Sequence, residues 1–398
     1  MPYCREIIAT GIGRRRFEFL SENPTNQIEM PDKLKIAIVG HTSRGNYGHG
    51  LDVCWREMPE VEIVGVADAN EKGLADAKAR LGAPRAFADY RRLLDETKPD
   101  IVSICTRHPD QHRDMFLEAA TRGIHAYMEK PMCLTPAQAD EMTAAAKHHG
   151  VKLAIAHLTR YSPLVDVIKE LIADGAIGRV LEYRGRGKED SRRGGGEDLW
   201  VLGSHILNLI HVFAGDPEWC FATMEQDGRR VAKEHVKPGN EGLGPLAGDT
   251  VHATYGLAGG SIATFDSVRG AGAGRPWRFA LHIMGSKGII EILTGYLPQV
   301  SILQDASWSP ARSGKRWRPV SSAGIGKSEP FKGDPRLQGN ITAARDLIQA
   351  IRDDRNPECD VHEGRMAIEM IHGVFDSHRV GAPVSFPLKT RENPLALI

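Results

Sequence analysis

The spacing of hydrophobic positions divides the chain into two parts. In the first, short apolar runs rich in β-branched residues alternate with longer amphipathic stretches. The short runs predict strands at 35–39, 61–67, 101–105, 124–128 and 152–156, and the longer stretches predict helices at 46–57, 71–81, 110–122 and 135–149. Strands separated by helices of this length indicate βαβ units, a parallel sheet and helices on both of its faces.

The second part shows a different pattern. An amphipathic helix is predicted at 161–174, a strand at 180–184 and a helix around Gly203–Asn208. Short runs separated by turns then predict an antiparallel meander, with strands at 221–224, 250–257, 261–267, 278–285, 288–293 and 299–303. Residues 227–249 and 305–338 are expected to be long loops, and helices at 339–353 and 363–377 close the chain.

Length and composition limit the classes of function. The chain has 398 residues, enough for about two domains, with 41% hydrophobic and 26% charged residues. Lysine plus arginine equals aspartate plus glutamate at 51 each, so neither a nucleic acid nor an acidic membrane surface is expected as a partner. No apolar run approaches the roughly 18 residues of a membrane span.

The cysteines and the N-terminal residues indicate the cellular compartment of the protein. The six cysteines are scattered without a C-x-x-C pair, which argues against a zinc site and a disulfide framework; no metal site is predicted. A reducing, cytoplasmic compartment is therefore expected. The arginines at 14–16 are not followed by the apolar segment of an export signal, and residues 1–33 are predicted to form a polar arm.

A glycine-rich turn follows the first predicted strand. Gly40, Gly45 and Gly48 could provide the tight turn and the close approach that a dinucleotide pyrophosphate needs. Gly40 and Gly45 alone also fit the usual spacing, with Thr42 in place of the middle glycine. The alternative is an ordinary turn, because glycines alone are a weak signal.

An acid ends the second strand. Asp68 stands where a carboxylate can accept hydrogen bonds from the ribose hydroxyls of an adenosine. The next two residues, Ala69 and Asn70, include no arginine for a 2′-phosphate, so NAD is favoured over NADP. Asp68 could instead cap the following helix. The turn, the acid and the alternation together predict a dinucleotide-binding domain over 34–157.

The fourth strand of this series ends in Glu129-Lys130-Pro131. Charged groups at the carboxyl end of a parallel strand lie where open α/β sheets bind ligands. Thr135 and Pro136 then give a helix start, with Thr135 as N-cap. The alternative is a charged turn ended by proline.

Several stretches together resemble the Gfo/Idh/MocA oxidoreductase family. They are the glycine turn with VGVAD at 64–68, SICTRHPDQH at 103–112, HAYMEKPMCLT at 125–135, HLTRYSP at 157–163 and LGSHILNL at 202–209. The resemblance implies a Rossmann domain followed, over 158–398, by an α+β domain with a large, open, mostly antiparallel sheet. That sheet would carry subunit contacts, giving a homodimer or homotetramer.

The resemblance also implies roles for single residues. Lys130 would reach the substrate hydroxyl beside the nicotinamide, and Glu129 would shape the nicotinamide–ribose pocket. Pro131 would shape the turn through a cis bond. Thr106 and His112 would match the turn on the cofactor side, although Arg107 stands where the family commonly has proline and the spacing is one residue wider.

His205 would be the family's helix histidine, able to exchange a proton with a substrate hydroxyl. The family commonly has aspartates four residues before this histidine and three after it, where this chain has Val201 and Asn208. Asp198, seven residues before His205, could replace the orienting acid, or it could be a helix N-cap.

The predicted function is an NAD-dependent oxidoreductase acting on a secondary hydroxyl of a sugar, cyclitol or related polyol, with Lys130 and His205 on either side of the hydroxyl. Which of the two takes the proton is left open. The polar segment 186–198 is a candidate substrate loop, with Lys188, Arg192 or Arg193 toward the ligand, or a solvated loop. The alternatives are a cofactor-binding regulatory or scaffolding paralogue and an NAD-assisted glycosidase.

Overall fold

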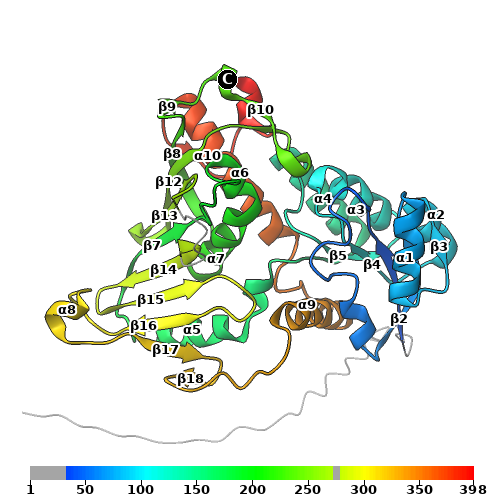
Figure 1. Ribbon diagram of the computed structural model, residues 1–398, viewed down its shortest axis with the longest axis horizontal. Coiled ribbons are helices and arrows are strands. Elements are labelled where there is room, and N and C mark those ends of the chain that lie inside the picture. The colour runs from blue at the N-terminus through cyan, green and yellow to red at the C-terminus, as the bar shows by residue number, and fades with distance from the viewer. Residues whose placement is uncertain (1–32, 272–277) are drawn as a thin grey trace, which may run out of the picture. The chain divides into compact units, whose positions relative to one another are not determined.

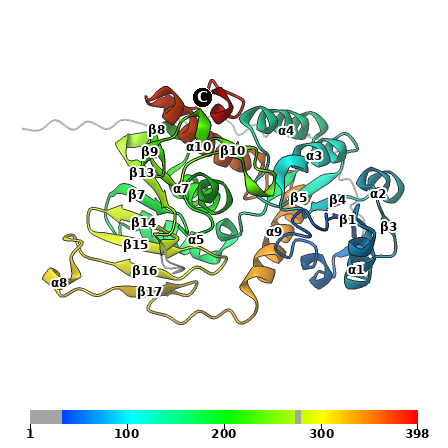
Figure 2. The same ribbon diagram turned by 45° about the horizontal axis from the view of Figure 1, so that its top comes forward.

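Two β-sheets organise the chain in the computed structural model, which describes residues 33–271 and 278–398 (Figure 1, Figure 2). The first sheet is parallel, with the strand order β3-β2-β1-β4-β5-β6. Its strands are β1 (Leu34–Val39), β2 (Val61–Ala67), β3 (Ala86–Phe87), β4 (Ile101–Ile104), β5 (His125–Met128) and β6 (Leu153–Ile155). The strand order reverses between β1 and β4, and open α/β sheets bind ligands at such a switch point.

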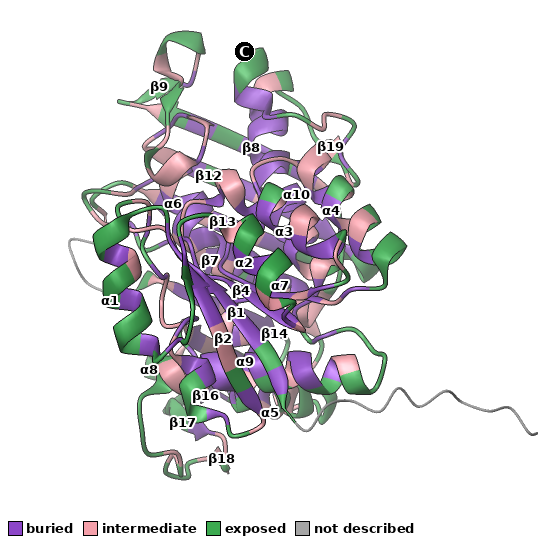
Figure 3. Cartoon of the chain, turned by 90° about the vertical axis from the view of Figure 1, so that its right-hand side faces the viewer, coloured by how far each residue is buried: buried purple, intermediate pink, exposed green. Residues whose placement is uncertain are grey.

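The helices of this half cover both faces of the sheet. They are α1 (Glu71–Leu81), α2 (Tyr90–Thr97), α3 (His112–Ala120) and α4 (Pro136–His149). Figure 3 shows the buried strands β1 and β4 beside α1 and α2, whose outer surfaces are exposed. The predicted strands and three of the four predicted helices are confirmed, and α4 begins as expected, with the Thr135 hydroxyl accepting from the backbone N–H of Gln138 at 3.2 Å.

The helix predicted at 46–57 is wrong. Only a 3₁₀ turn at Cys54–Glu57 forms there. The reason is the backbone: Gly45, Gly48 and Gly50 have φ angles of +88°, +65° and +96°, and a right-handed helix cannot pass through such residues. The segment is an irregular turn folded against the carboxyl ends of the strands.

The second sheet has eleven strands, in the order β18-β17-β16-β15-β14-β7-β13-β12-β8-β19, with β9 paired to β8. The strands are β7 (Val180–Arg186), β8 (Pro217–Gln226), β9 (Arg229–Arg230), β12 (Thr250–Leu257), β13 (Ile262–Val268), β14 (Ala280–Gly285), β15 (Gly288–Leu293), β16 (Val300–Leu303), β17 (Arg318–Ser321), β18 (Gly324–Ile325) and β19 (Val384–Ser385). A separate pair, β10 (Lys237–Pro238) and β11 (Pro245–Leu246), lies in one predicted loop.

The predicted simple meander is wrong in one respect. β7 lies between β13 and β14, parallel to the former and antiparallel to the latter. A two-residue turn joins β14 directly to β15, whereas residues 269–279 separate β13 from β14 in the sequence, and an earlier strand pairs between them. The sheet is thus large and mostly antiparallel, as the family resemblance implied.

The remaining helices all follow the first sheet in the sequence. They are α5 (Pro163–Ala173), α6 (Gly196–Asp198), a π-helix (Leu199–Gly203), α7 (Ser204–Ala214), α8 (Pro310–Ser313), α9 (Pro335–Arg352) and α10 (Val361–Val380). α10 packs against α4 of the first sheet and against α7 and β8 of the second (Figure 1). Tyr127 on β5 donates a hydrogen bond to Asn340 on α9 at 2.7 Å, and both side chains are buried.

Short 3₁₀ turns complete the described chain, at Pro109–Gln111, Leu158–Tyr161, Lys233–His235, Asn240–Gly242, Ala258–Gly260 and Pro394–Leu397. None of the helices within 33–271 and 278–398 is long and apolar enough to cross a bilayer. The predicted N-terminal arm lies, except for Lys33, outside the described residues.

Candidate active site

A cavity of about 850 Å³, here called the central cavity, opens where β4 and β5 end. The two predicted catalytic residues, Lys130 and His205, both line it. Lys130 follows β5 of the parallel sheet, whereas His205 lies in the first turn of α7. The fold therefore brings together two side chains that are far apart in the sequence. The other charged or polar lining residues include His49, Arg107, Glu129, Lys188, Arg193 and Glu241.

Lys130 is held by a backbone group of the helix that leads to His205. Its Nζ donates to the carbonyl oxygen of Val201 at 2.6 Å, and the residue is only 7% exposed. Burial lowers the pKa of Lys130, although the neighbouring Glu129 carboxylate acts in the opposite direction. The Lys130–Pro131 peptide bond is cis, as the resemblance implied.

His205 is surrounded by rings rather than by carboxylates. Its imidazole lies edge to face with that of His157, with ring centroids 5.4 Å apart, and with the Phe279 ring at 6.5 Å. Burial lowers the pKa of His205 well below its usual value, and the positive charge of Lys130 adds to this effect. The ring is therefore neutral at pH 7 and can accept a proton or a hydrogen bond.

The predicted role of Asp198 is wrong in both of its forms. The carboxylate accepts from the backbone N–H of Glu189 at 3.0 Å and from the Ser267 hydroxyl at 2.6 Å, and it has no bond to His205. It does not cap a helix either: it belongs to α6 and directly precedes the π-helix at Leu199–Gly203, but its side chain makes no capping hydrogen bond. The π-helix at Leu199–Gly203 changes the register between positions 198 and 205, so the two residues do not share the expected face.

The other departure from the family pattern is Asn208, which is buried. Its amide nitrogen lies 4.0 Å from the Cys359 sulfur, which places this side chain against the core. His205 thus has no carboxylate partner among the described residues. Its orientation depends on the packing of His157 and Phe279.

Glu129 connects the glycine turn to the lysine. The carboxylate accepts from the backbone N–H of Lys130 at 2.7 Å and forms a short contact with Nδ1 of His49. Burial acts to raise the pKa of Glu129, but the His49 bond and the Lys130 charge outweigh it, and the pKa falls below its usual value. The carboxylate is therefore ionised in the wall of the central cavity.

The glycine turn needs glycine at all three predicted positions because it packs tightly. A Cβ on Gly40 would lie 2.2 Å from the ring of Tyr47. A Cβ on Gly45 would lie 2.7 Å from the backbone nitrogen of Arg107, and one on Gly48 would lie 2.6 Å from the carbonyl oxygen of Cys105. The turn therefore lies directly against the segment that follows β4, with Gly45 and Gly48 at positive φ.

Asp68 lines a second hollow of about 320 Å³, here called the side hollow, beside the ends of β1 and β2. Its carboxylate accepts from the Thr42 backbone N–H at 2.9 Å, from the Thr42 hydroxyl at 2.6 Å and from the Asn70 backbone N–H at 2.9 Å. Asn70, not Asp68, is the N-cap of α1. Arg91 also lines this hollow; the prediction missed it because it missed the helix α2 that carries it.

His112 plays a different part from the one expected. Its ring is fully buried, with Nε2 2.7 Å from the carbonyl oxygen of Thr106 and Nδ1 2.9 Å from that of Pro131. Both ring nitrogens face the protein, so His112 joins the turns after β4 and β5 instead of contacting a ligand. Thr106 is buried beside it, and its hydroxyl has no hydrogen-bond partner among the described residues.

These features fit a dinucleotide at the edge of the parallel sheet. The side hollow has an acid at the end of β2, and the central cavity has a buried amine and a neutral imidazole. The glycine turn, with His41 in the side hollow and His49 in the central cavity, runs past both. Asp68, the turn and Glu129 are the groups that would hold such a cofactor.

Comparison with protein-family models also indicates a dinucleotide-binding oxidoreductase. Residues 34–157 match the model of the oxidoreductase family with an NAD-binding Rossmann fold, and residues 169–386 match the C-terminal alpha/beta domain of that family. The chain belongs to the Gfo/Idh/MocA oxidoreductase family. Residues 34–157 thus form an NAD-binding Rossmann domain, as the strand order had indicated.

Among curated relatives, the levoglucosan dehydrogenase of Pseudarthrobacter phenanthrenivorans is 26% identical over 249 residues, which cover 56% of this chain and 63% of that protein. The D-apiose dehydrogenase of Paraburkholderia graminis is 30% identical over 191 residues, 46% and 51% of the two chains. The chain therefore spans about half to just under two thirds of the length of these relatives.

Solved structures show the same fold. An NAD binding oxidoreductase from Klebsiella pneumoniae superposes with a TM-score of 0.70 at 19% identity, covering 89% of this chain and 99% of that one. Levoglucosan dehydrogenase in complex with NADH and levoglucosan gives a TM-score of 0.70 at 21% identity, covering 89% and 100%. The second sheet as well as the Rossmann sheet is therefore shared.

Proposed function

We propose that this protein is an NAD-dependent oxidoreductase that moves hydride between nicotinamide and a secondary hydroxyl or ketone of a sugar, cyclitol or related polyol. The observation that carries the proposal is the meeting of Lys130 and His205 at the central cavity, beside the end of β5. Relatives named for dehydrogenation of levoglucosan and D-apiose support the substrate class.

The two residues have complementary roles. The ammonium of Lys130 has three N–H groups, so it can keep its bond to Val201 and still donate to a substrate oxygen. This donation stabilises negative charge that develops on that oxygen. The neutral His205 ring accepts the hydroxyl proton. The bound cofactor supplies the hydride acceptor, and the protein supplies position and charge.

Lys188 and Arg193 are the candidates for binding the rest of the substrate. Both line the central cavity, whereas Arg192 does not. Arg193 is already paired with Glu241 at 2.7 Å and its side chain is only 12% exposed, so its position is fixed. Lys188 is exposed and has only a 3.6 Å ion pair with Asp190, so it can adjust to different hydroxyl patterns.

The test is a panel of sugars, cyclitols and polyols, each supplied with NAD, with reduction followed as NADH absorbance. Turnover of at least one member with net NADH formation is the expected result. Cleavage of an aryl glycoside without net NADH would instead support an NAD-assisted glycosidase. Binding of NAD with no turnover of either kind would support a regulatory paralogue.

We also infer a cytoplasmic homo-oligomer. The scattered cysteines described by the structure are unpaired, which suits a reducing compartment. Two large apolar side chains on the second sheet, Phe221 and Ile262, are 41% and 37% exposed, and a subunit contact over this sheet would cover them. Light scattering coupled to gel filtration tests the oligomer, and a monomer at micromolar concentration would contradict it.

A further inference from the structure

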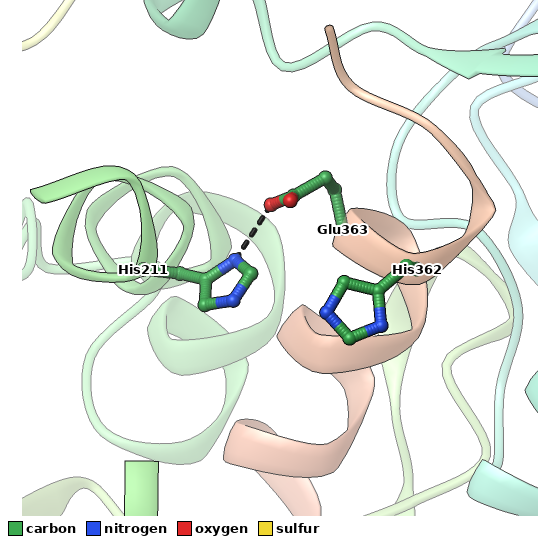
Figure 4. Close-up of side chains that lie close together, drawn as sticks. All are labelled: His211, His362 and Glu363. Carbon is green, nitrogen blue, oxygen red and sulfur yellow. Dashed lines mark hydrogen bonds and ion pairs between the residues drawn. The ribbon is translucent and has the colours of Figure 1, made fainter. Parts of the chain in front are cut away.

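A second cluster of ionisable side chains lies where α7 ends and α10 begins, outside the lining of the central cavity. It consists of His211 in the last turn of α7, Asp216 just after that helix, and His362 and Glu363 in the first turn of α10 (Figure 4 shows the two histidines and Glu363). None of these residues takes part in the proposed hydride transfer.

The contacts place three donor atoms close together. Nε2 of His211 lies 2.6 Å from Oδ1 of Asp216, and Nε2 of His362 lies 3.3 Å from the same oxygen. In Figure 4 the two imidazole rings lie side by side; their centroids are 5.6 Å apart and their planes are tilted by 55°. Two imidazole nitrogens and one carboxylate oxygen thus converge on one region.

The fourth residue fixes the tautomer of the first. Nδ1 of His211 lies 2.6 Å from Oε2 of Glu363, on the side of the ring away from Asp216. A histidine that ligates a metal commonly donates its other N–H to a carboxylate, which orients the ring and makes it more basic. Glu363 also forms an ion pair with Arg160, so its own charge is balanced without the cluster.

The start of α10 and the end of α7 hold the side chains of this cluster in place and favour a bound cation. Asp360 caps α10 and accepts from the backbone N–H groups of His362 and Glu363 at 2.8 and 3.2 Å, which fixes the backbone of both residues. The carboxyl end of α7, which carries His211, has the negative end of the helix dipole and favours a cation nearby. Gly215, with a φ of +75°, then turns the chain so that Asp216 comes back to His211.

We propose that His211 and His362, through Nε2, and Asp216, through Oδ1, bind a divalent transition metal ion of the Zn²⁺ class, with Glu363 orienting His211. Nitrogen and carboxylate ligands of this kind suit Zn²⁺, with water at the fourth position. Ion pairs account for each of these contacts taken singly. The donor atoms of His211, His362 and Glu363 also all lie within 4.8 Å of one another, however, and such a group can hold a metal ion.

The site would join two helices that matter for the proposed chemistry. α7 carries His205, and α10 packs against α4 of the Rossmann half as well as against α7. A metal ion at their junction would fix α7 relative to α10. It would stabilise the fold, and because the site lies outside the central cavity it would not be a reactant.

The test uses the full chain without a histidine tag, treated with chelator and then dialysed. Titration with Zn²⁺ is expected to show one binding site that is weakened more than tenfold in His362→Ala. Glu363→Gln should weaken binding by roughly 10- to 100-fold, the usual effect of losing such an orienting partner. Co²⁺ in place of Zn²⁺ should give visible absorption bands that His362→Ala lacks.

A matched control is His252→Ala. His252 is also an exposed histidine paired with a carboxylate, Asp266, but it has no second histidine within reach of that carboxylate in the described chain. This variant should bind Zn²⁺ like the wild type. Equal Zn²⁺ affinity in wild type and His362→Ala, or equal losses in His362→Ala and His252→Ala, would overturn the proposal.

Loss of Zn²⁺ binding in His362→Ala can be distinguished from loss of the fold. The His362 side chain is 49% exposed, so its removal should leave the metal-free melting temperature close to that of the wild type. Zn²⁺ should then raise the melting temperature of the wild type, because a ligand that binds only the folded state stabilises it. A rise of the same size in His362→Ala would contradict the assigned ligands.

Discussion

The amine of Lys130 lies 2.6 Å from the carbonyl oxygen of Val201, so the end of β5 is tied to the π-helix that leads into α7. This contact aligns the two halves of the candidate site, because Lys130 belongs to the Rossmann half and His205 follows Val201 by four residues on the other side. A change at either position should therefore affect the geometry of both.

Lys130→Met should remove activity while the fold remains. Loss of a donor that stabilises a developing oxyanion commonly lowers kcat by roughly 10²- to 10³-fold. Because burial disfavours the charged amine, its replacement by an apolar side chain of similar length should not lower the melting temperature. Steady-state kinetics and thermal melting measure the two effects.

The control for this variant is Lys169→Met, an exposed lysine near Glu358 at 3.9 Å. It should keep wild-type kcat. If Lys130→Met kept more than a tenth of the wild-type kcat, Lys130 would not be the oxyanion donor.

The pH dependence should show that His205 is already neutral. Burial and the charge of Lys130 hold the pKa of His205 well below its usual value, so the ring stays unprotonated at about pH 6.5, where an ordinary histidine titrates. Lowering the pH from 8 to 6.5 should therefore cause no loss of kcat/KM for alcohol oxidation through this residue. His205→Gln should lower kcat by roughly 10²- to 10⁴-fold at all these pH values.

His148→Gln, at the exposed end of α4, is the comparison and should leave the profile unchanged. An acid limb near pH 6.5 in the wild type that disappears in His205→Gln would show that the ring titrates normally. The inference from burial would then be wrong.

The Rossmann half was readable from the sequence because each of its strands is a short apolar run with a clear stop. β3 and α2 were missed. β3 has only two residues, and α2, Tyr90–Thr97, buries only Leu93 and Leu94, so its sequence shows too few apolar positions to reveal a helical period. The position of β7 between β13 and β14 was also missed. Strand order depends on pairing between distant segments, which no local pattern records.

In the candidate site too, local features were predicted from the sequence and features that depend on the three-dimensional arrangement were not. Lys130, His205 and Glu129 were predicted and do share one cavity, since strand ends and helix starts are local features. The π-helix at Leu199–Gly203 was not predicted, because one extra residue in a helical turn leaves no mark in a hydrophobic pattern. That single insertion is why Asp198 faces Ser267 instead of His205.

Asp198→Ala should therefore change stability and not the pH profile of turnover. The substitution leaves the Glu189 backbone N–H and the Ser267 hydroxyl without their acceptor in a buried region, at a cost of about 1–3 kcal/mol. Urea unfolding measures this loss. A shifted pH profile of kcat with unchanged stability would instead support a direct effect of Asp198 on His205.

Gly73→Ala should destabilise the protein even though alanine is the better helix former by about 1 kcal/mol. A Cβ at position 73 would lie 1.9 Å from the hydroxyl oxygen of Thr42, the group that donates to Asp68. The clash should displace Thr42, lower the melting temperature and weaken NAD binding. In a Thr42→Gly background the same substitution should cost much less, because its steric partner is gone; an equal cost in both backgrounds would exclude the clash.

Asp68 should set the preference for NAD over NADP. Its carboxylate is buried at the side hollow, where a 2′-phosphate would bring a second negative charge close to it. Asp68→Ala removes that repulsion but also leaves the Thr42 and Asn70 backbone N–H groups without an acceptor. We therefore expect kcat/KM to fall for NAD and the ratio of NAD to NADP efficiency to fall by about tenfold or more, equivalent to about 1.4 kcal/mol.

The comparison for Asp68 is Asp89→Ala. Asp89 also lines the side hollow, but it is exposed and caps α2 through the backbone N–H of Arg91 at 2.8 Å. Because solvent screens its charge, its removal should change the cofactor ratio much less than removal of Asp68. If the two variants shifted the ratio equally, selectivity would come from the summed charge of the hollow, and the buried position of Asp68 would have no special role.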